Sequence, residues 1–279
     1  MKQKIIFFGT GDYTLSVIQA LKNYNLALVV TTEAGGKVEK FARTQNIPCL
    51  VTDLRNKEDL NRIKNLRPTL GILASFGSIV PKEIIDIFPN GILNIHPSLL
   101  PKYKGPSPIQ TTILNGDDTT GVTIIKLDEE IDHGPIAYQV SVNLTGHETT
   151  EDLKRTLFKI GADLIDQIIK GLEAGKLISY EDQDHTKESF TEKFDNDAGK
   201  VDFASPPDTE TLNRMIRALY PSPGVYTIVN IGGKDKRLKL LPKNRVQLEG
   251  KNMMTTDDFI NGYQKEGEEI IEKLGLKKA

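Results

Sequence analysis

Several features that mark other classes of protein are missing from this sequence of 279 residues. Cys49 is its single cysteine, so a disulfide bond within one chain and a zinc site built from cysteines are excluded. No apolar run approaches the roughly 18 residues of a membrane span. The apolar stretch Ile5–Phe8 ends at Gly9, which predicts a buried strand and not a secretion signal. We therefore expect a reduced, cytoplasmic protein without a membrane segment.

A dominant charge and the common metal and nucleophile motifs are missing as well. The formal net charge is -2, so no overall basic field indicates a DNA-binding protein. No His-x-x-x-His pair or carboxylate–histidine cluster with ligand spacing occurs. A Gly-x-Ser-x-Gly elbow is absent, and the segment Ser75–Ser78 does not match it. The sequence thus predicts neither a metal centre nor a serine hydrolase.

The first half of the chain has the pattern of an α/β domain. Charged residues make up 27% and hydrophobic residues 38%, which is typical of a globular protein. Short apolar segments alternate with amphipathic ones, which predicts βαβ units in a mainly parallel, Rossmann-like sheet. The expected strands are 5–8, 26–31, 48–51, 69–74 and 91–95, and the expected helices are 12–23, 38–45, 57–66 and 81–87.

The second half predicts a change of architecture. Two strands, 121–127 and 135–143, precede a long amphipathic helix over 149–170. The polar stretch 187–207 is typical of a linker, and a helix over 209–219 and short strands within 225–247 follow it. We therefore expect a catalytic α/β domain over 1–186, a linker over 187–207 and a small, β-rich, OB-like domain over 208–279.

The densest local signal is the segment Leu93–Pro101. Asn94 and His96 stand two residues apart in a predicted strand, so both point to one side of it. They lie where a parallel strand ends, which is where ligands gather in open α/β sheets. An amide and an imidazole can together bind a carbonyl oxygen and move a proton. The alternative is that the histidine caps a loop and the asparagine satisfies main-chain groups.

Two further segments admit more than one interpretation. In Asp128–Gly134, Asp132 can orient an imidazole or accept a proton from a reacting amine, or the acidic run can be a solvated turn. Spacing alone does not bring it to His96. The turn Gly9–Gly11 resembles a dinucleotide fingerprint, but Thr14 stands where the third glycine belongs. A structural turn is therefore favoured over a nicotinamide site.

These segments together resemble the folate-dependent formyltransferases. The likeness rests on Asn94-Ile-His96, on Ser98–Pro101, on Gly105–Gln110 and on Asp132-His133-Gly134. It implies that Asn94, His96 and Asp132 form the catalytic set and that 10-formyltetrahydrofolate is the formyl donor, with no metal. The residues implied to bind the folate are Phe76, Gly77, Ser78, Ile79, Val80, Leu93, Ser98, Leu99, Leu100, Pro101, Asp128, Glu129 and Glu130.

Within the family, the sequence is most similar to the members that formylate methionyl initiator tRNA. The residues from Arg214 to Lys251 include nine basic and two acidic side chains, a formal charge of about +7 that suits a phosphate backbone. The implied partner is an aminoacylated initiator tRNA. The residues implied to bind this acceptor are Gly105, Pro106, Ser107, Pro108, Gln110, Arg217, Lys236, Arg237 and Lys239.

The sequence departs from those tRNA-formylating members in two places. The loop Thr31–Val38 is short and has one basic residue, Lys37, where they have a longer basic insertion. Strands are also missing between Leu241 and Val246. The alternative acceptor is an amino-sugar nucleotide, formylated with the same donor and the same three residues. Alternatives from other classes are a non-catalytic folate- or RNA-binding module, a hydrolase of the formyl donor and a nicotinamide-dependent dehydrogenase.

Overall fold

The computed structural model describes residues 2–277, which form two compact units. Each unit gathers stretches that are separate in the sequence. Within the described residues, the first unit comprises residues 2–105, 119–142 and 154–190, and the second comprises residues 106–118, 143–153 and 191–277.

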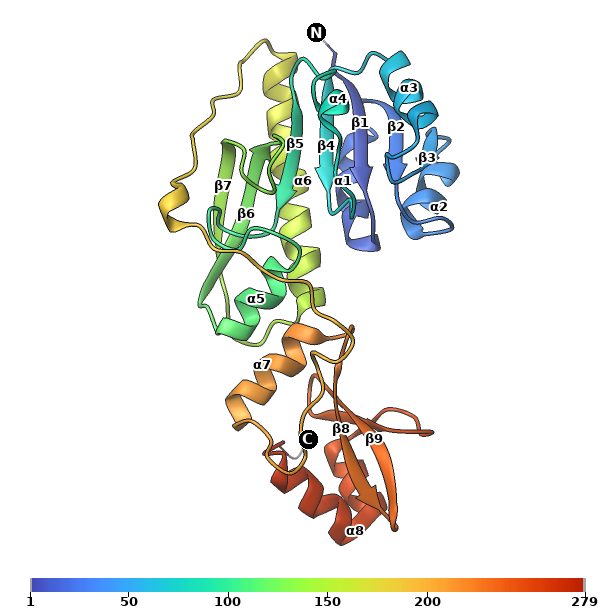
Figure 1. The fold of residues 1–279 in the computed structure, drawn as a ribbon, viewed down its shortest axis with the longest axis vertical. Helices are drawn as coiled ribbons and strands as arrows, with labels where there is room; N and C mark the ends of the chain where they lie inside the picture. The colour runs from blue at the N-terminus through green and yellow to red at the C-terminus, as the bar shows by residue number, and fades with distance from the viewer. Residues whose placement is uncertain (1, 278–279) are drawn as a thin grey trace. The chain divides into compact units, whose positions relative to one another are not determined.

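A seven-stranded sheet forms the centre of the first unit (Figure 1). Its strand order is β3-β2-β1-β4-β5-β6-β7. The first five strands pair in parallel, and β6 pairs antiparallel with β5. The prediction of a mainly parallel, Rossmann-like sheet is therefore confirmed. The strands are β1 (Lys4–Gly9), β2 (Asn25–Thr31), β3 (Cys49–Val51), β4 (Leu70–Ala74), β5 (Ile92–His96), β6 (Thr119–Lys126) and β7 (Ile136–Asn143).

Helices cover this sheet because its strands are apolar on both faces. On one face, Ile6, Phe8 and Ile92 belong to a buried cluster that also contains Ile63 of α3 (Lys57–Asn65) and Ile84 of α4 (Lys82–Ile85). The predicted helix over 12–23 is shorter here: a 3-10 turn at Asp12–Thr14 leads into α1. The α-helices of the N-terminal two thirds are α1 (Leu15–Leu21), α2 (Lys37–Thr44), α3 (Lys57–Asn65), α4 (Lys82–Ile85), α5 (Pro108–Asn115) and α6 (Thr150–Glu173).

The second unit contains an antiparallel sheet of four strands in the order β11-β10-β9-β8. The expected β-rich C-terminal part is thus confirmed. Two helical segments that meet at a kink at Gln264, together called α8, follow the sheet and were not predicted; the first begins at a capping box in which Thr255 and Asp258 satisfy each other's main-chain N–H groups. The elements are α7 (Thr209–Leu219), β8 (Val225–Ile231), β9 (Lys234–Leu241), β10 (Arg245–Leu248), β11 (Met254–Thr255) and α8 (Thr256–Lys273). Over residues 2–277, none of the helices has both the length and the apolar composition that crossing a bilayer requires.

Candidate active site

Strand β5 carries Asn94 and His96 in the interior of the sheet. Ile95 between them faces α6, where an added Cβ at Gly161 would lie 2.4 Å from its Cγ2 atom. Because side chains alternate along a strand, Asn94 and His96 point to the opposite face. Only 7% of Asn94 and 4% of His96 is exposed, so both polar groups are removed from bulk water and need partners within the protein.

Asp132, in the loop between β6 and β7, joins these two side chains. Its Oδ1 atom lies 3.1 Å from Asn94 Nδ2, which donates to it, and 3.3 Å from His96 Nδ1. Its Oδ2 atom accepts a hydrogen bond of 2.8 Å from the main-chain N–H of Gly105. The structure thus brings together the three side chains that the sequence could only propose as a set; their catalytic roles stay a prediction.

The imidazole of His96 has an acceptor at each nitrogen. Nδ1 faces the Asp132 carboxylate, and Nε2 lies 2.9 Å from the carbonyl oxygen of Tyr103. A neutral imidazole has one N–H, so only the imidazolium satisfies both acceptors. The two acceptors therefore hold the imidazole in one orientation between the Asp132 carboxylate and the Tyr103 carbonyl.

The surroundings of Asp132 keep it ionised. Burial by itself would raise the pKa of this carboxyl group. The charge and hydrogen bond of His96, the Gly105 amide and the Lys104 ammonium act in the opposite direction, and together they hold the pKa of Asp132 below its ordinary value. A carboxylate is thus available at neutral pH to accept from all its donors.

The main chain around Asp132 explains the D-x-G pattern of the sequence. Asp132 has a φ of 50°, in the left-handed region that few non-glycine residues adopt. Two residues later, an added Cβ at Gly134 would lie 1.8 Å from the carbonyl oxygen of Lys126, which no side chain tolerates. Glycine therefore lets the loop close against the end of β6 and turn Asp132 toward β5.

The two loops predicted to hold the folate lie next to each other. Lys82, at the start of α4, contacts Glu129 of the β6–β7 loop at 3.0 Å. Ile79 and Ile131 are large apolar residues on these loops, with 76% and 62% of their surfaces exposed. Exposed apolar side chains beside a buried polar site are typical of a ligand cleft.

Several side chains of the predicted folate set are buried, and their role in folate binding stays a prediction. Phe76 and Val80 are buried in the core cluster with Phe8, and the Leu93 side chain is fully buried in the sheet. Ser98 and Leu100 are also buried, and Ser98 Oγ donates to the carbonyl of Lys102 at 2.7 Å. These side chains fix the shape of the loops. The members of the set whose residues are at least partly exposed are Gly77, Ser78, Ile79, Leu99, Pro101, Asp128, Glu129 and Glu130.

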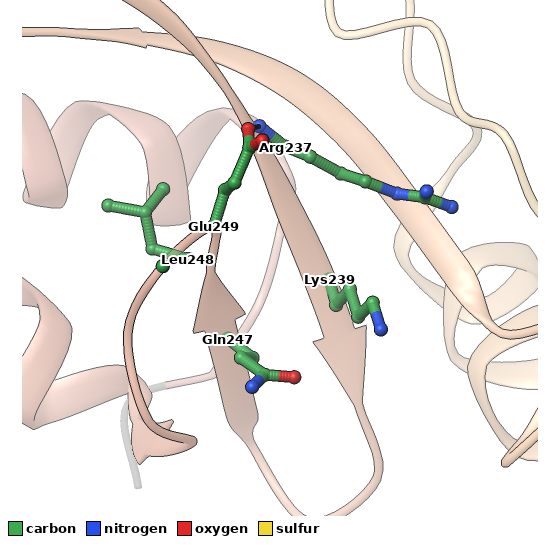
Figure 2. A pocket seen from close by; sticks show the side chains of 6 residues that line it. Arg237, Lys239, Gln247, Leu248 and Glu249 are labelled. Atoms are coloured by element: carbon green, nitrogen blue, oxygen red, sulfur yellow. Dashed lines mark hydrogen bonds between the residues drawn. The ribbon is translucent and has the colours of Figure 1, made fainter.

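The predicted acceptor residues of the C-terminal strands do not all share one face. Arg237 and Lys239 of β9 point to the same side as Gln247 of β10, whereas Leu248 points away (Figure 2). With Gly250 and Glu249 they line a hollow of about 240 Å³. Lys236 lies on the opposite face, in line with the buried Leu238.

Two more contacts involve basic residues that are predicted to bind the acceptor. The guanidinium of Arg237 stacks over the ring of Tyr226, 3.5 Å from its centre. Arg217 of α7, the fourth basic residue predicted to bind the acceptor, is half-buried and donates to the main-chain carbonyl of Glu148 at 3.0 Å. Arg217 therefore joins two segments of the second unit.

The other residues predicted to bind the acceptor lie around the start of α5. Gly105 lies in the first unit, and Pro106, Ser107, Pro108 and Gln110 belong to the second.

The segment after α6 contains site residues that sequence reasoning missed. Gln183 Nε2 donates to the carbonyl oxygens of Asp132 and Gly134, at 2.9 Å and 2.7 Å. Ser189 Oγ accepts from the N–H of Tyr103 at 2.9 Å. The polar composition of residues 187–207 predicts a linker there. No local pattern marks Gln183 or Ser189, since their partners are main-chain groups.

A search for related families gives one match over the sheet-forming region. Residues 3–169, more than half of the chain, fit the family described as formyl transferase. The chain belongs to the formyl transferase family. Asn94, His96 and Asp132 all lie within the matched region.

Relatives and solved structures of formyltransferases extend the likeness to most of the chain. Methionyl-tRNA formyltransferase of Bartonella henselae is 32% identical over 86% of this chain and 81% of its own length. That of Chloroflexus aggregans is 35% identical over 80% of this chain and 76% of its own. The solved sugar 3N-formyl transferase WlaRD matches 90% of this chain and 100% of its own with a TM-score of 0.65 and 22% identity, a likeness of fold.

Proposed function

We propose that this chain transfers a formyl group from 10-formyltetrahydrofolate to the amino group of methionyl-tRNA. The proposal rests on one observation above all: Asn94, His96 and Asp132 form a buried, hydrogen-bonded cluster at the end of β5. The relatives named methionyl-tRNA formyltransferase, which match at 32% and 35% identity, support the acceptor. We infer a cytoplasmic enzyme that acts in translation initiation.

The formyl carbon is attacked by the neutral amine of the acceptor. A bond forms between the amine nitrogen and the formyl carbon, the bond from that carbon to N10 of the folate breaks, and one proton passes from the amine to N10. Negative charge develops on the formyl oxygen during the attack. We assign the second N–H of the Asn94 carboxamide to this oxygen, since the first is donated to Asp132.

His96 and Asp132 supply the electrostatic part of the mechanism. The ionised carboxylate of Asp132, 3.3 Å from His96 Nδ1, stabilises an imidazolium next to the developing oxyanion. Donation from Nε2 to the substrate requires that this nitrogen exchange its present partner, the Tyr103 carbonyl. His96 and Asp132 then relay the amine proton through water.

The folate is assigned to the two adjoining loops after β4 and between β6 and β7. The Lys82–Glu129 ion pair joins these loops, and Ile79 and Ile131 offer exposed apolar surface to an aromatic ring system. The tRNA backbone is assigned to the face of β8–β10 that carries Arg237 and Lys239, where basic side chains can neutralise phosphates.

An acceptor competition tests the proposal. The purified protein is given 10-formyltetrahydrofolate with methionyl-tRNA, with an amino-sugar nucleotide, or with no amine, and the formylated product and free formate are measured. We expect formyl-methionyl-tRNA as the main product. Asn94→Ala protein prepared in parallel controls for formyltransferase from the expression host. Preferential formylation of the sugar nucleotide, or release of formate without an amine, would replace the proposed acceptor by a sugar or by water.

A further inference from the structure

The segment 181–190, here called the strap, contacts both loops that surround His96. It follows α6 in the sequence and runs beside β7 (Figure 1), where Glu181 and Ile136 exchange two main-chain hydrogen bonds of 2.8 Å and 2.9 Å. Further along, Ser189 donates its N–H to the carbonyl of Pro101, and its own carbonyl accepts from Lys104. The strap therefore ties the loop 101–105 to the loop that carries Asp132.

Gln183 holds the Asp132 loop by its main chain. Its side chain is buried, with 6% of the residue exposed. Its Nε2 group donates one hydrogen bond to the carbonyl oxygen of Asp132 and one to that of Gly134. Asp132 is in a left-handed conformation, which is unfavourable for a residue with a side chain. A conformation of this kind persists only where surrounding contacts fix it, and Gln183 supplies two of them.

Ser189 holds the opposite side of His96. Its hydroxyl accepts from the N–H of Tyr103, and the carbonyl of Tyr103 is the partner of His96 Nε2. Tyr103 also has a positive φ, 62°. The strap thus reaches one residue on each side of the imidazole: Asp132, which faces Nδ1, and Tyr103, which faces Nε2.

We propose that Gln183 and Ser189 are positioning residues for formyl transfer; this inference rests on the proposed function of the site. Both side chains form their hydrogen bonds with main-chain groups. They act by fixing the main chain that aims the Asp132 carboxylate and the Tyr103 carbonyl at His96. A displacement of about 1 Å at such a site costs up to about 10²-fold in rate.

Two strap variants and one matched control test this role by kinetics. Gln183→Met keeps the length of the side chain and removes its donors, and Ser189→Ala removes one hydroxyl. The control is Gln3→Met, because Gln3 is equally buried and accepts from Thr69 and Asn90 at the start of β1, at the opposite end of the sheet. We expect both strap variants to lose about 10- to 100-fold in kcat while KM for each substrate changes less than about 3-fold. A loss of kcat no greater than that of Gln3→Met would overturn the proposal.

An NMR measurement decides the same question without any substrate. The Gly105 amide proton reports on the carboxylate of Asp132, which accepts it at 2.8 Å. We expect this resonance to move upfield in Gln183→Met and to stay unchanged in Gln3→Met. Should wild-type protein formylate none of the amines, the proposed function fails, yet this resonance still tests the strap. Should Gln183→Met not fold, the ring nitrogen shifts of His96 in Ser189→Ala decide. Unchanged resonances overturn the proposal.

Discussion

Replacing Asp132 by asparagine removes the charge at the centre of the site and keeps the size of the side chain. The two carboxylate oxygens accept from Asn94, from His96 and from the Gly105 amide. A carboxamide has a single acceptor oxygen, so its amino group must face at least one of these donors in a buried position. Opposite charges about 4 Å apart attract by about 4 kcal/mol at an effective dielectric constant near 20. Losing most of this attraction from the transition state lowers kcat by about 10²- to 10³-fold.

The assay is a single-turnover formylation of methionyl-tRNA at saturating donor. Asp166→Asn is the matched control, because this carboxylate of α6 also accepts hydrogen bonds, from Tyr24 at 2.6 Å and from Lys170 at 2.7 Å. We expect the control to keep the wild-type rate and Asp132→Asn to keep its affinity for tetrahydrofolate. An Asp132→Asn rate within about 3-fold of wild type would refute the electrostatic role of this carboxylate.

The same variant has a pH signature in stability. The pKa of Asp132 in the folded protein lies below its ordinary value, so the folded state favours the ionised form. This contribution is present above the unfolded pKa of about 4 and is lost as the pH falls through the folded pKa. Urea unfolding should therefore show the largest difference between wild type and Asp132→Asn near neutral pH and a smaller one below pH 4.

Three further predictions test the other parts of the site. His96→Ala should lower kcat by at least about 10²-fold with little change in folate affinity measured by calorimetry; near-normal turnover would exclude the histidine from the mechanism. Arg237→Glu with Lys239→Glu should raise KM for tRNA and reduce the log–log salt slope by close to one unit per lost phosphate contact, whereas Lys236→Glu, on the other face, should change neither; equal effects of the two charge reversals would contradict the assigned face. Gly134→Ala should destabilise the fold by about 1–3 kcal/mol in urea and lower kcat, because its Cβ overlaps a carbonyl oxygen; wild-type stability would show that the loop can relax.

The sheet could be predicted from the sequence because its strands are short, wholly apolar and separated by amphipathic helices. Helix α5 was hidden by the run Gly105–Pro108, which indicates a loop until Pro108 occupies the first turn of a helix. Helix α8 was hidden by its polar composition and by Gly262 and Gly267. The predicted end of the catalytic domain at residue 186 and the predicted start of the C-terminal domain at residue 208 stay a prediction.

The candidate site could be predicted only in part. The two-residue spacing of Asn94 and His96 is a local property, but the approach of Asp132 depends on how β6 pairs with β5. Gln183 could not be found, because its partners are carbonyl groups that every residue has. The sequence alone could have predicted that Arg237 and Lys236 lie on different faces of the sheet, because adjacent residues of a strand point to opposite faces.

The strap also sets the order in which the nascent chain becomes competent. His96 and Asp132 are synthesised well before Gln183 and Ser189, which stand roughly ninety residues after His96. At about 5–20 residues per second, the roughly 50 residues between Asp132 and Gln183 take on the order of 3–10 s to synthesise, and during this time the polar cluster lacks the segment that fixes it. A ribosome-bound chain stopped at residue 180 would therefore lack the contacts that fix Asp132 and Tyr103, and full activity would begin only after the strap has left the exit tunnel.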